Sequence, residues 1–228
     1  MKNKNLYIIL LTLACGLGVT LFYKLGWFEV LELKTLDFRF RLFAEPEKAS
    51  KEIVIVAIDE KSLREFKRNN VVWKWPRDIY AALVRYLHRG GARAIIFDIL
   101  FTDPDIDRLS SDAEETDGAF ARSMAEAGNV LLAAHLRREE DVLSQDNPLL
   151  NLPDFQFQPA GCGEKFESFS TAVLPVPLFQ QSAAGLGVAN YYEDKDGICR
   201  RIPLFLNFNQ IALPHLGVAA FLFIQNII

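Results

Sequence analysis

The sequence predicts an α/β fold: a parallel-sheet core with βαβ crossovers and a C-terminal antiparallel hairpin, preceded by one transmembrane helix. Three observations support it. A charge-free apolar segment lies near the N-terminus, β-branched runs alternate with amphipathic stretches in the middle, and an acidic turn signal separates two apolar stretches near the end. The chain has 228 residues, of which 50% are hydrophobic and 24% charged. This composition is sufficient for a packed core and excludes predominant disorder.

The first apolar segment, residues 5–23, contains no charge and has about the length that an α-helix needs to cross a bilayer. We predict an uncleaved anchor over 5–23, behind a short N-terminus over 1–4. A cleaved signal peptide and lipidation at Cys15 are the alternatives. Basic residues flank both ends of the segment, so the positive-inside rule leaves its orientation open.

Residues 27–43 fit two patterns. Their apolar side chains form a stripe at helical spacing, and part of the same stretch alternates as a strand would. We favour a helix that continues from the anchor. Residues 45–51 form a linker, in which Pro46 ends the preceding element.

The middle of the chain alternates strand and helix signals. Continuous β-branched runs predict strands buried on both faces, and start and stop residues delimit the helices. In order, the predicted elements are a strand over 53–58, a helix from Pro76 to the Gly90-Gly91 stop, a strand over 94–101, a helix over 113–127 and a strand over 130–135. Short links between them predict right-handed crossovers and a parallel sheet.

The C-terminal part is less regular. Residues 136–174 show no clear period and are expected to run over the surface. Residues 186–192 and 198–208 flank the turn signal EDKDG and predict an antiparallel hairpin. Residues 214–228 predict an apolar helix that is too short to cross a bilayer.

Two carboxylates end the first two predicted strands, where an open parallel sheet binds its ligands. They are Asp59 and Asp98. The alternative is that each carboxylate accepts backbone N–H bonds from the turn that follows it. Ser62 lies three residues after Asp59, where it would either cap a helix or reach the same ligand.

Trp75 and Arg77 are further candidates for ligand contact, because aromatic and guanidinium groups supply large contacts at binding sites. Alternatively, the tryptophans cover the edge of the sheet and Pro76 only fixes the entry into the helix. Trp73 is assigned to the core.

An acidic run resembles a calcium-binding loop in part, through Asp103, Asp105, Asp107 and Glu114. Arg108 stands where that loop needs glycine, so a solvated acidic loop is the better interpretation. No metal site and no cofactor is predicted.

Charge and cysteine content narrow the class of protein. The chain has 25 Lys and Arg against 29 Asp and Glu, without the basic excess of nucleic-acid-binding proteins, so nucleic acid is not an expected partner. Three cysteines are too few for a disulfide scaffold. A pairing of Cys162 with Cys199 in an exported domain stays open.

A family resemblance covers residues 27–228. It is carried by the ordered series IVIVAIDEKS, WPRDIYAALVRYLHRGGARAIIFDILF, NVLLAAHL, GVANYYEDKDGICRRIPL and ALPHL. This series resembles the second class of CHASE domains, which are extracellular sensory domains associated with cyclases and histidine kinases. The motif positions that it marks are Asp59, Ser62, Trp75, Pro76, Arg77, Asp98, Asp117, Asp196, Gly197 and Arg200.

The resemblance implies an exported sensory domain over 27–228 of a bacterial receptor in the cell (inner) membrane, with residues 1–4 in the cytoplasm and the domain in the periplasm or outside the cell. It also implies further transmembrane helices and a cytoplasmic cyclase, kinase or phosphatase output beyond Ile228. The chain itself is therefore expected not to be an enzyme, and no catalytic residue is assigned.

The leading hypothesis is a sensory module that binds an unidentified small-molecule or protein signal near the strand ends. The expected ligand-binding residues are Asp59, Ser62, Trp75, Arg77 and Asp98. The expected partners are the membrane and a second copy of the chain in a homodimer.

Two rival functions remain. One is a membrane-anchored metal-dependent hydrolase that holds a divalent ion with Asp59, Asp98 and Asp103, although no nucleophile or base is convincingly placed. The other is a passive scaffold that assembles through residues 27–43 and the C-terminal helix.

Overall fold

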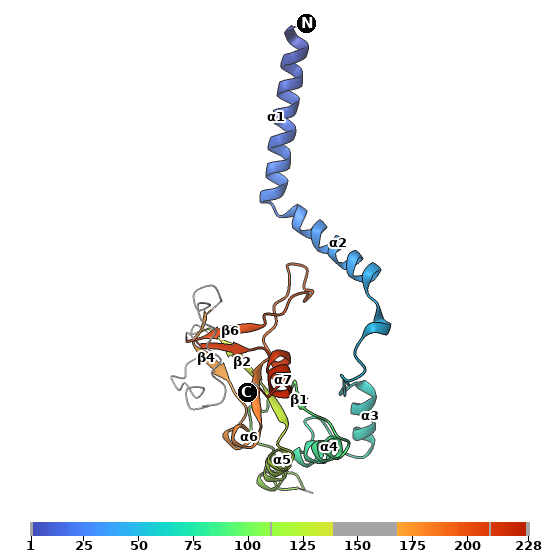
Figure 1. Cartoon of the computed structure of the whole chain (residues 1–228), viewed down its shortest axis with the longest axis vertical. Helices are drawn as coiled ribbons and strands as arrows, with labels where there is room; N and C mark the ends of the chain where they lie inside the picture. The colour runs from blue at the N-terminus through green and yellow to red at the C-terminus, as the bar shows by residue number, and fades with distance from the viewer. Residues whose placement is uncertain (1, 110, 139–167, 210, 227–228) are drawn as a thin grey trace. The chain divides into compact units, whose positions relative to one another are not determined.

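A computed structural model describes residues 2–109, 111–138, 168–209 and 211–226. The chain divides into two compact units. The first contains Met1–Ile58 with Glu193–Ile198, and the second contains Asp59–Tyr192 with Cys199–Ile228. Figure 1 labels the helices and strands in chain order.

The first unit begins with two helices, α1 (Lys2–Lys24) and α2 (Trp27–Phe43). Gly26 separates them with a left-handed φ of 73°, a conformation that glycine adopts without steric cost. The prediction of a helix over 27–43 is confirmed, although it is a second helix rather than a continuation of α1. Within α1, Tyr7–Lys24 is long and apolar enough to cross a membrane, a criterion that a signal sequence also meets.

Residues 53–58 depart from the prediction. The sequence predicts a strand buried on both faces, but the structure assigns no strand to this segment, and its residues are exposed. It follows the short 3₁₀ turn η1 (Pro46–Lys48) within the predicted linker. An apolar run indicates that a segment needs burial, but it does not specify a partner strand.

The second unit contains the predicted βαβ core. Strand β1 (Ile95–Phe97) pairs in parallel with β2 (Val130–Arg137), and α5 (Ala113–Ala127) connects them. The helix over 113–127 is confirmed at both ends, because Asp112 caps its start and Gly128 ends it in a left-handed conformation. Strand β1 is shorter than the predicted 94–101.

Two further helices precede this core. Helix α3 (Glu60–Arg68) is followed by α4 (Arg77–Arg89), which begins directly after Pro76 as predicted. Helices α4 and α5 lie side by side (Figure 1). Their buried faces meet around aromatic side chains, which are Tyr80, Phe97, Phe101, Phe120 and Phe179.

The sheet that contains β1 and β2 is mixed. Strand β5 (Gly185–Val188) pairs with β2 in parallel, whereas β4 (Thr171–Val173) pairs with the end of β2 in antiparallel orientation. The described end of the expected surface excursion over 136–174 therefore contributes to a sheet. Residues 139–167, including Cys162, lie outside the described residues.

The predicted hairpin is wrong in its position. A second sheet contains β3 (Ser168–Phe169), β6 (Phe205–Phe208) and β7 (Ile211–Pro214), and the antiparallel pair is β6 with β7. The EDKDG signal does form a turn, in which Gly197 has a left-handed φ of 77°. Only the isolated bridge between Tyr192 and Arg201 pairs the two segments around that turn among the described residues.

Helix α6 (Pro177–Ser182) packs against α5, and α7 (Leu216–Ile224) packs against β5 and β2. The predicted apolar C-terminal helix is confirmed by α7. Its close approach depends on Gly187 in β5, because a Cβ atom there would lie 2.5 Å from Leu216 Cα. Such a contact forces the helix and the strand apart.

We therefore expect Gly187→Ala to lower the free energy of unfolding by about 1–3 kcal/mol through overpacking. Gly217→Ala is the matched control on α7, because a Cβ atom there meets nothing within 4 Å. Urea denaturation of the full chain in detergent, followed by tryptophan fluorescence, measures both. Equal stability of the two variants would contradict this account of the packing.

Candidate functional site

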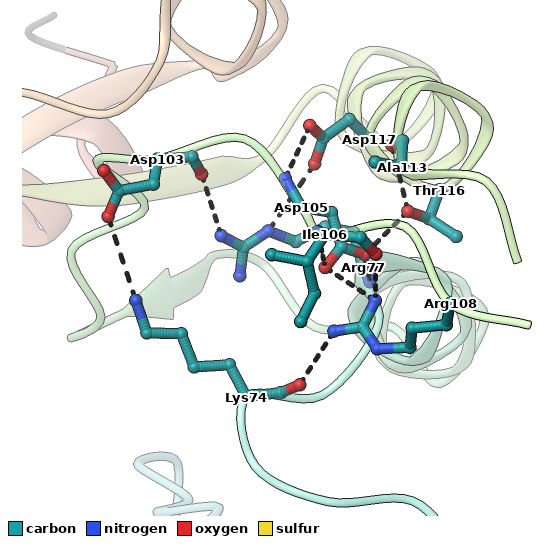
Figure 2. A network of polar contacts seen from close by, with 9 residues as sticks. All are labelled: Lys74, Arg77, Asp103, Asp105, Ile106, Arg108, Ala113, Thr116 and Asp117. Atoms are coloured by element: carbon teal, nitrogen blue, oxygen red, sulfur yellow. Dashed lines mark hydrogen bonds and ion pairs between the residues drawn. The ribbon is translucent and has the colours of Figure 1, made fainter.

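A buried network of charged and polar side chains joins the start of α4 to the connection between β1 and α5 (Figure 2). Arg77 in α4 and Asp117 in α5 are each only 7% exposed. The side chain of Asp105, which belongs to the connection, is 3% exposed. Charges removed from water to this degree require partners, and the network supplies them.

Asp105 is the centre of this network. Its Oδ2 accepts hydrogen bonds from the Arg77 backbone N–H at 2.9 Å and from Thr116 Oγ1 at 2.7 Å. Its Oδ1 accepts from the Ile106 N–H at 2.9 Å and from Arg108 Nη1 at 2.8 Å. Burial raises the pKa of Asp105, but these donors outweigh it, so the pKa lies below its ordinary value and the ionised form is favoured.

Asp105 also caps α4 from a distant part of the sequence. The first N–H groups of a helix have no partner within the helix, and Pro76, at the N-cap position, makes no side-chain cap. The Asp105 carboxylate takes that role for the Arg77 N–H. A negative charge at the start of a helix is also favourable to its dipole.

The guanidinium of Arg77 is held on several sides. Its Nη2 donates to the carbonyl oxygen of Asp103 at 3.1 Å, and its Cζ lies 4.7 Å from the centre of the Phe101 ring. Its Nε lies 3.6 Å from Asp117 Oδ1, which is an ion pair but too long for a hydrogen bond. Within the described part of the chain, neither of these two buried atoms has a hydrogen-bond partner.

The Asp117 carboxylate therefore accepts fewer hydrogen bonds than that of Asp105. Its Oδ2 accepts the Asp105 N–H at 3.0 Å. Burial raises the pKa of Asp117 above its ordinary value, and the bond from Asp105 and the charge of Arg77 oppose this only in part. The Arg77–Asp117 contact is thus looser than the hydrogen bonds of Asp105.

A hollow of about 480 Å³ lies beside the start of α5. Its acidic lining is Asp107, Asp112, Glu114 and Asp117, and its apolar lining includes Val176 and Leu178. Asp107 and Asp112 accept backbone N–H bonds from Ala113 and Glu115, so their carboxylates hold the helix start. The predicted solvated acidic loop is wrong for Asp105, whose side chain is buried.

The other candidate surface is at the carboxyl ends of the strands. Asp98 follows β1 and is exposed. His215 directly precedes α7 and forms a parallel bridge with Val188 at the end of β5. Burial lowers the pKa of His215 below its ordinary value of 6.5, and the charge of Asp98 and a backbone hydrogen bond at Asn190 oppose that shift.

Asn190 and His215 stabilise this edge. The buried Asn190 side chain accepts from the Leu136 N–H at 2.7 Å and donates to the Leu136 carbonyl at 2.9 Å, which extends the β2–β5 pairing beyond the last strand residue. His215 Nδ1 accepts the Gly217 N–H at 3.5 Å and caps α7. This cap requires that Nδ1 carries no proton.

The structure supports the capping alternative for Asp59 and Ser62. Asp59 Oδ1 accepts the Ser62 N–H at 2.8 Å and the Ser62 hydroxyl at 2.7 Å, at the start of α3. These hydrogen bonds hold the pKa of Asp59 below its ordinary value. Ligand contact by this pair stays a prediction.

The two tryptophans are reversed relative to the prediction. Trp75 is in the core, 5% exposed, and stacks on Phe66 of α3 with ring centres 4.1 Å apart. Trp73, which was assigned to the core, is 49% exposed. Two tryptophans separated by one residue in a loop have no periodicity that would identify the inward one.

The predicted site residues therefore lie in three different places and do not form one site. Arg77 lies in the buried network, Asp59 and Ser62 cap α3, and Asp98 lies at the edge of the sheet. Among the described residues, no group of three or more His, Cys, Asp or Glu side chains is placed to hold a metal ion. The geometry therefore gives no support to the hydrolase alternative.

The sequence interpretation missed the roles of Asp105, Thr116, Asn190 and His215. Arg77 and Asp105 are 28 residues apart in the chain, and they meet where the start of α4 lies beside the connection that leads into α5. A local signal existed for His215 alone, since it directly precedes an apolar helix.

A family model for the CHASE2 domain matches residues 11–227. The chain belongs to the CHASE2 domain family. The resemblance seen in the sequence is thereby confirmed. No curated protein and no solved structure matched the chain. CHASE2 domains are extracytoplasmic sensory domains and are not catalytic by themselves.

The buried network gives the first test of this CHASE2 site. We expect Asp105→Ala to lower the free energy of unfolding by about 3 kcal/mol, because it leaves buried donors without an acceptor. Asp103→Asn is the control, since the Asp103 side chain is 71% exposed and only its backbone carbonyl contacts Arg77. The control is expected to change stability by less than about 0.5 kcal/mol in urea denaturation.

The histidines give a pH dependence. Burial lowers the pKa of both His135 and His215, so the unfolded chain binds more protons than the folded one as the pH falls below about 6.5. Their contribution to stability is complete above that pH and is lost as the pH falls through the folded pKa values. Asparagine is a good helix cap and does not titrate. We therefore expect the urea midpoint of the His215→Asn variant to change less between pH 7 and 5 than that of the parent chain. An unchanged dependence of the urea midpoint on pH would contradict the role of His215.

Proposed function

We propose that this chain is the sensing part of a membrane-anchored bacterial receptor, which binds a signal outside the cytoplasm and passes it to a cytoplasmic output domain. The observation that carries the proposal is the extent of the CHASE2 match. It begins at residue 11, inside the apolar helix α1, so the family pattern includes part of that helix. A helix shared with the family pattern favours a retained anchor over a cleaved signal.

The side chains of α1 support the same proposal. Tyr7–Lys24 is apolar and its residues are not buried in the protein, so lipid is the environment that suits them. With the CHASE2 domain outside the cytoplasm, a single span places the N-terminus inside. The anchor then connects the extracytoplasmic domain to the membrane in one pass.

We further propose that the signal binds at the carboxyl edge of the sheet, with Asp98 as an exposed contact. The support is the continuity of the connection from β1 to α5. This connection carries Asp98 at its start and the buried Asp105 further along. A ligand that moves Asp98 acts on the segment that caps α4, and the loose Arg77–Asp117 contact gives that segment room to move.

In this proposal the other sequence-predicted residues position the site. Trp75 and Arg77 hold the start of α4, while Asp59 and Ser62 hold the start of α3, which contacts Trp75 through Phe66.

Topology is tested with the exposed thiol of Cys199. A Cys15→Ser/Cys162→Ser variant keeps it as the sole cysteine of the three in the chain. We expect a membrane-impermeant maleimide to label this variant in intact cells, because the domain faces outward. Labelling that requires membrane permeabilisation would contradict the proposal.

Two controls accompany this experiment. A variant with all three cysteines replaced by serine reports background labelling. The intact mass of the purified protein shows whether α1 is retained. A mature protein that begins beyond Tyr23 and is freely soluble would contradict the anchored receptor.

A further inference from the structure

Helix α2 of the first unit carries an apolar stripe along one side. Successive side chains of an α-helix are about 100° apart around its axis, and by this spacing four large apolar side chains of α2 fall within about 60° of one another. They are Trp27, Leu31, Phe38 and Leu42. These four residues are between 59% and 66% exposed. The first unit leaves the stripe uncovered, and such an apolar surface indicates an interaction.

The opposite side of α2 is bound within the first unit. Leu33 on that side is buried, at 4% exposure. Glu29, on the same side, forms an ion pair with Lys195 of the segment Glu193–Ile198. Leu33 and Glu29 both lie roughly half a turn around the helix from the stripe. The stripe is therefore directed away from the part of the unit that holds α2.

The charged side chains of α2 are ordered around this stripe. The helix has three basic residues, Lys34, Arg39 and Arg41, and three acidic residues, Glu29, Glu32 and Asp37. Around the helix axis, each basic residue is closer to the centre of the stripe than any acidic residue is. Lys and Arg beside an apolar face rest their stems on it and extend their charges to lipid headgroups. This order is typical of a helix that lies in the surface of a membrane.

Helix α2 also begins where the apolar span ends. Only Leu25 and Gly26 separate it from α1, and the left-handed Gly26 ends the first helix there. Phe22 of α1 contacts Trp27 of α2, with ring centres 5.1 Å apart. With α1 in the bilayer, the start of α2 is at the bilayer surface, the level at which tryptophan is enriched.

We propose that α2 lies along the outer surface of the membrane. Its stripe enters the boundary between acyl chains and headgroups, and its basic side chains bind the phosphate groups of anionic lipids. The proposal rests on the proposed function, because it needs α1 to be retained as the anchor. A helix of 17 residues is about 25 Å long, so α2 gives the chain an extended second attachment to the membrane before the linker over 45–51.

A second copy of the chain fits the stripe less well than lipid does. A coiled-coil seam continues in steps of three and four residues, and from Trp27 these steps reach Lys34 and Arg41. Two copies anchored in one membrane have the same orientation, so their α2 helices would pair in parallel and bring each of these cations toward its own copy. Anionic headgroups instead place opposite charge beside them.

Nitroxide labels on the full chain test the proposal in vesicles of phosphatidylcholine and phosphatidylglycerol in equal amounts, with the three native cysteines replaced by serine. Phe38→Cys carries the label within the stripe, and Phe40→Cys is the matched control on the other side of the helix. The two phenylalanines are similarly exposed, at 65% and 59%. We expect the ratio of collisions with oxygen to collisions with a water-soluble nickel chelate to be about fivefold higher at position 38, because oxygen concentrates in the acyl region and the chelate stays in water.

Two outcomes overturn the proposal. Equal collision ratios at positions 38 and 40, with the chelate reaching both, place the stripe in water. A label at position 38 that neither reagent reaches shows that protein covers the stripe. Magnetic coupling between two such labels then identifies a second copy as the cover, and its absence identifies the second unit of the same chain.

A third label separates this inference from the proposed function. Leu17 lies within the span Tyr7–Lys24 and is 72% exposed in the protein. A high collision ratio for Leu17→Cys together with a low ratio for Phe38→Cys overturns the surface helix and leaves the anchor intact. A low ratio for Leu17→Cys overturns the retained anchor, and with it this inference.

Lipid composition tests the basic side chains. In vesicles of phosphatidylcholine alone, we expect the collision ratio at position 38 to fall about twofold, because the attraction between the cations and the headgroups is lost. Lys34→Gln/Arg41→Gln is expected to remove this dependence on lipid. Lys61→Gln/Arg64→Gln in α3 changes the net charge equally and is expected to preserve it. Equal ratios in the two kinds of vesicle for the parent chain would overturn the binding of anionic lipid.

Discussion

The carboxylate of Asp105 is the constraint on which the second unit depends. It is removed from water and holds four donors, which come from the start of α4, from α5 and from its own connection. An intact buried ion pair adds little stability, whereas removing one partner destabilises the fold strongly. The network therefore fixes geometry more than it adds stability. It joins the start of α4 to α5 and to the connection from β1.

The second unit has a buried polar interior and a more exposed edge at the strand ends. Arg77 and Asp105 lie inside, over an aromatic core, whereas Asp98 and His215 lie at the strand ends. The described residues show no metal-holding group. The CHASE2 match identifies a sensory domain, and the signal-binding role of this edge is our proposal. The connection between β1 and α5 belongs to both the interior and the edge, so the proposed effect of a bound signal is assigned to it.

Local signals explain what could be predicted. The helix over 113–127 has a capping aspartate, a helical period and a terminating glycine, and all three act within a few residues. The Asp59–Ser62 spacing predicts its cap for the same reason. Prediction failed where a choice depended on distant segments, as in the reversal of Trp73 and Trp75 or the pairing of β6 with β7.

The sequence by itself determined the apolar span of α1, the helix limits around α4 and α5, the parallel order of β1 and β2, and the family. These depend on composition, caps and periods that short segments carry alone. Only the tertiary structure decided that the Asp105 side chain is buried with Arg77 and Asp117, and that β6 pairs with β7. Burial of a charge and pairing of a strand are properties of two segments at once, and one segment cannot specify the other.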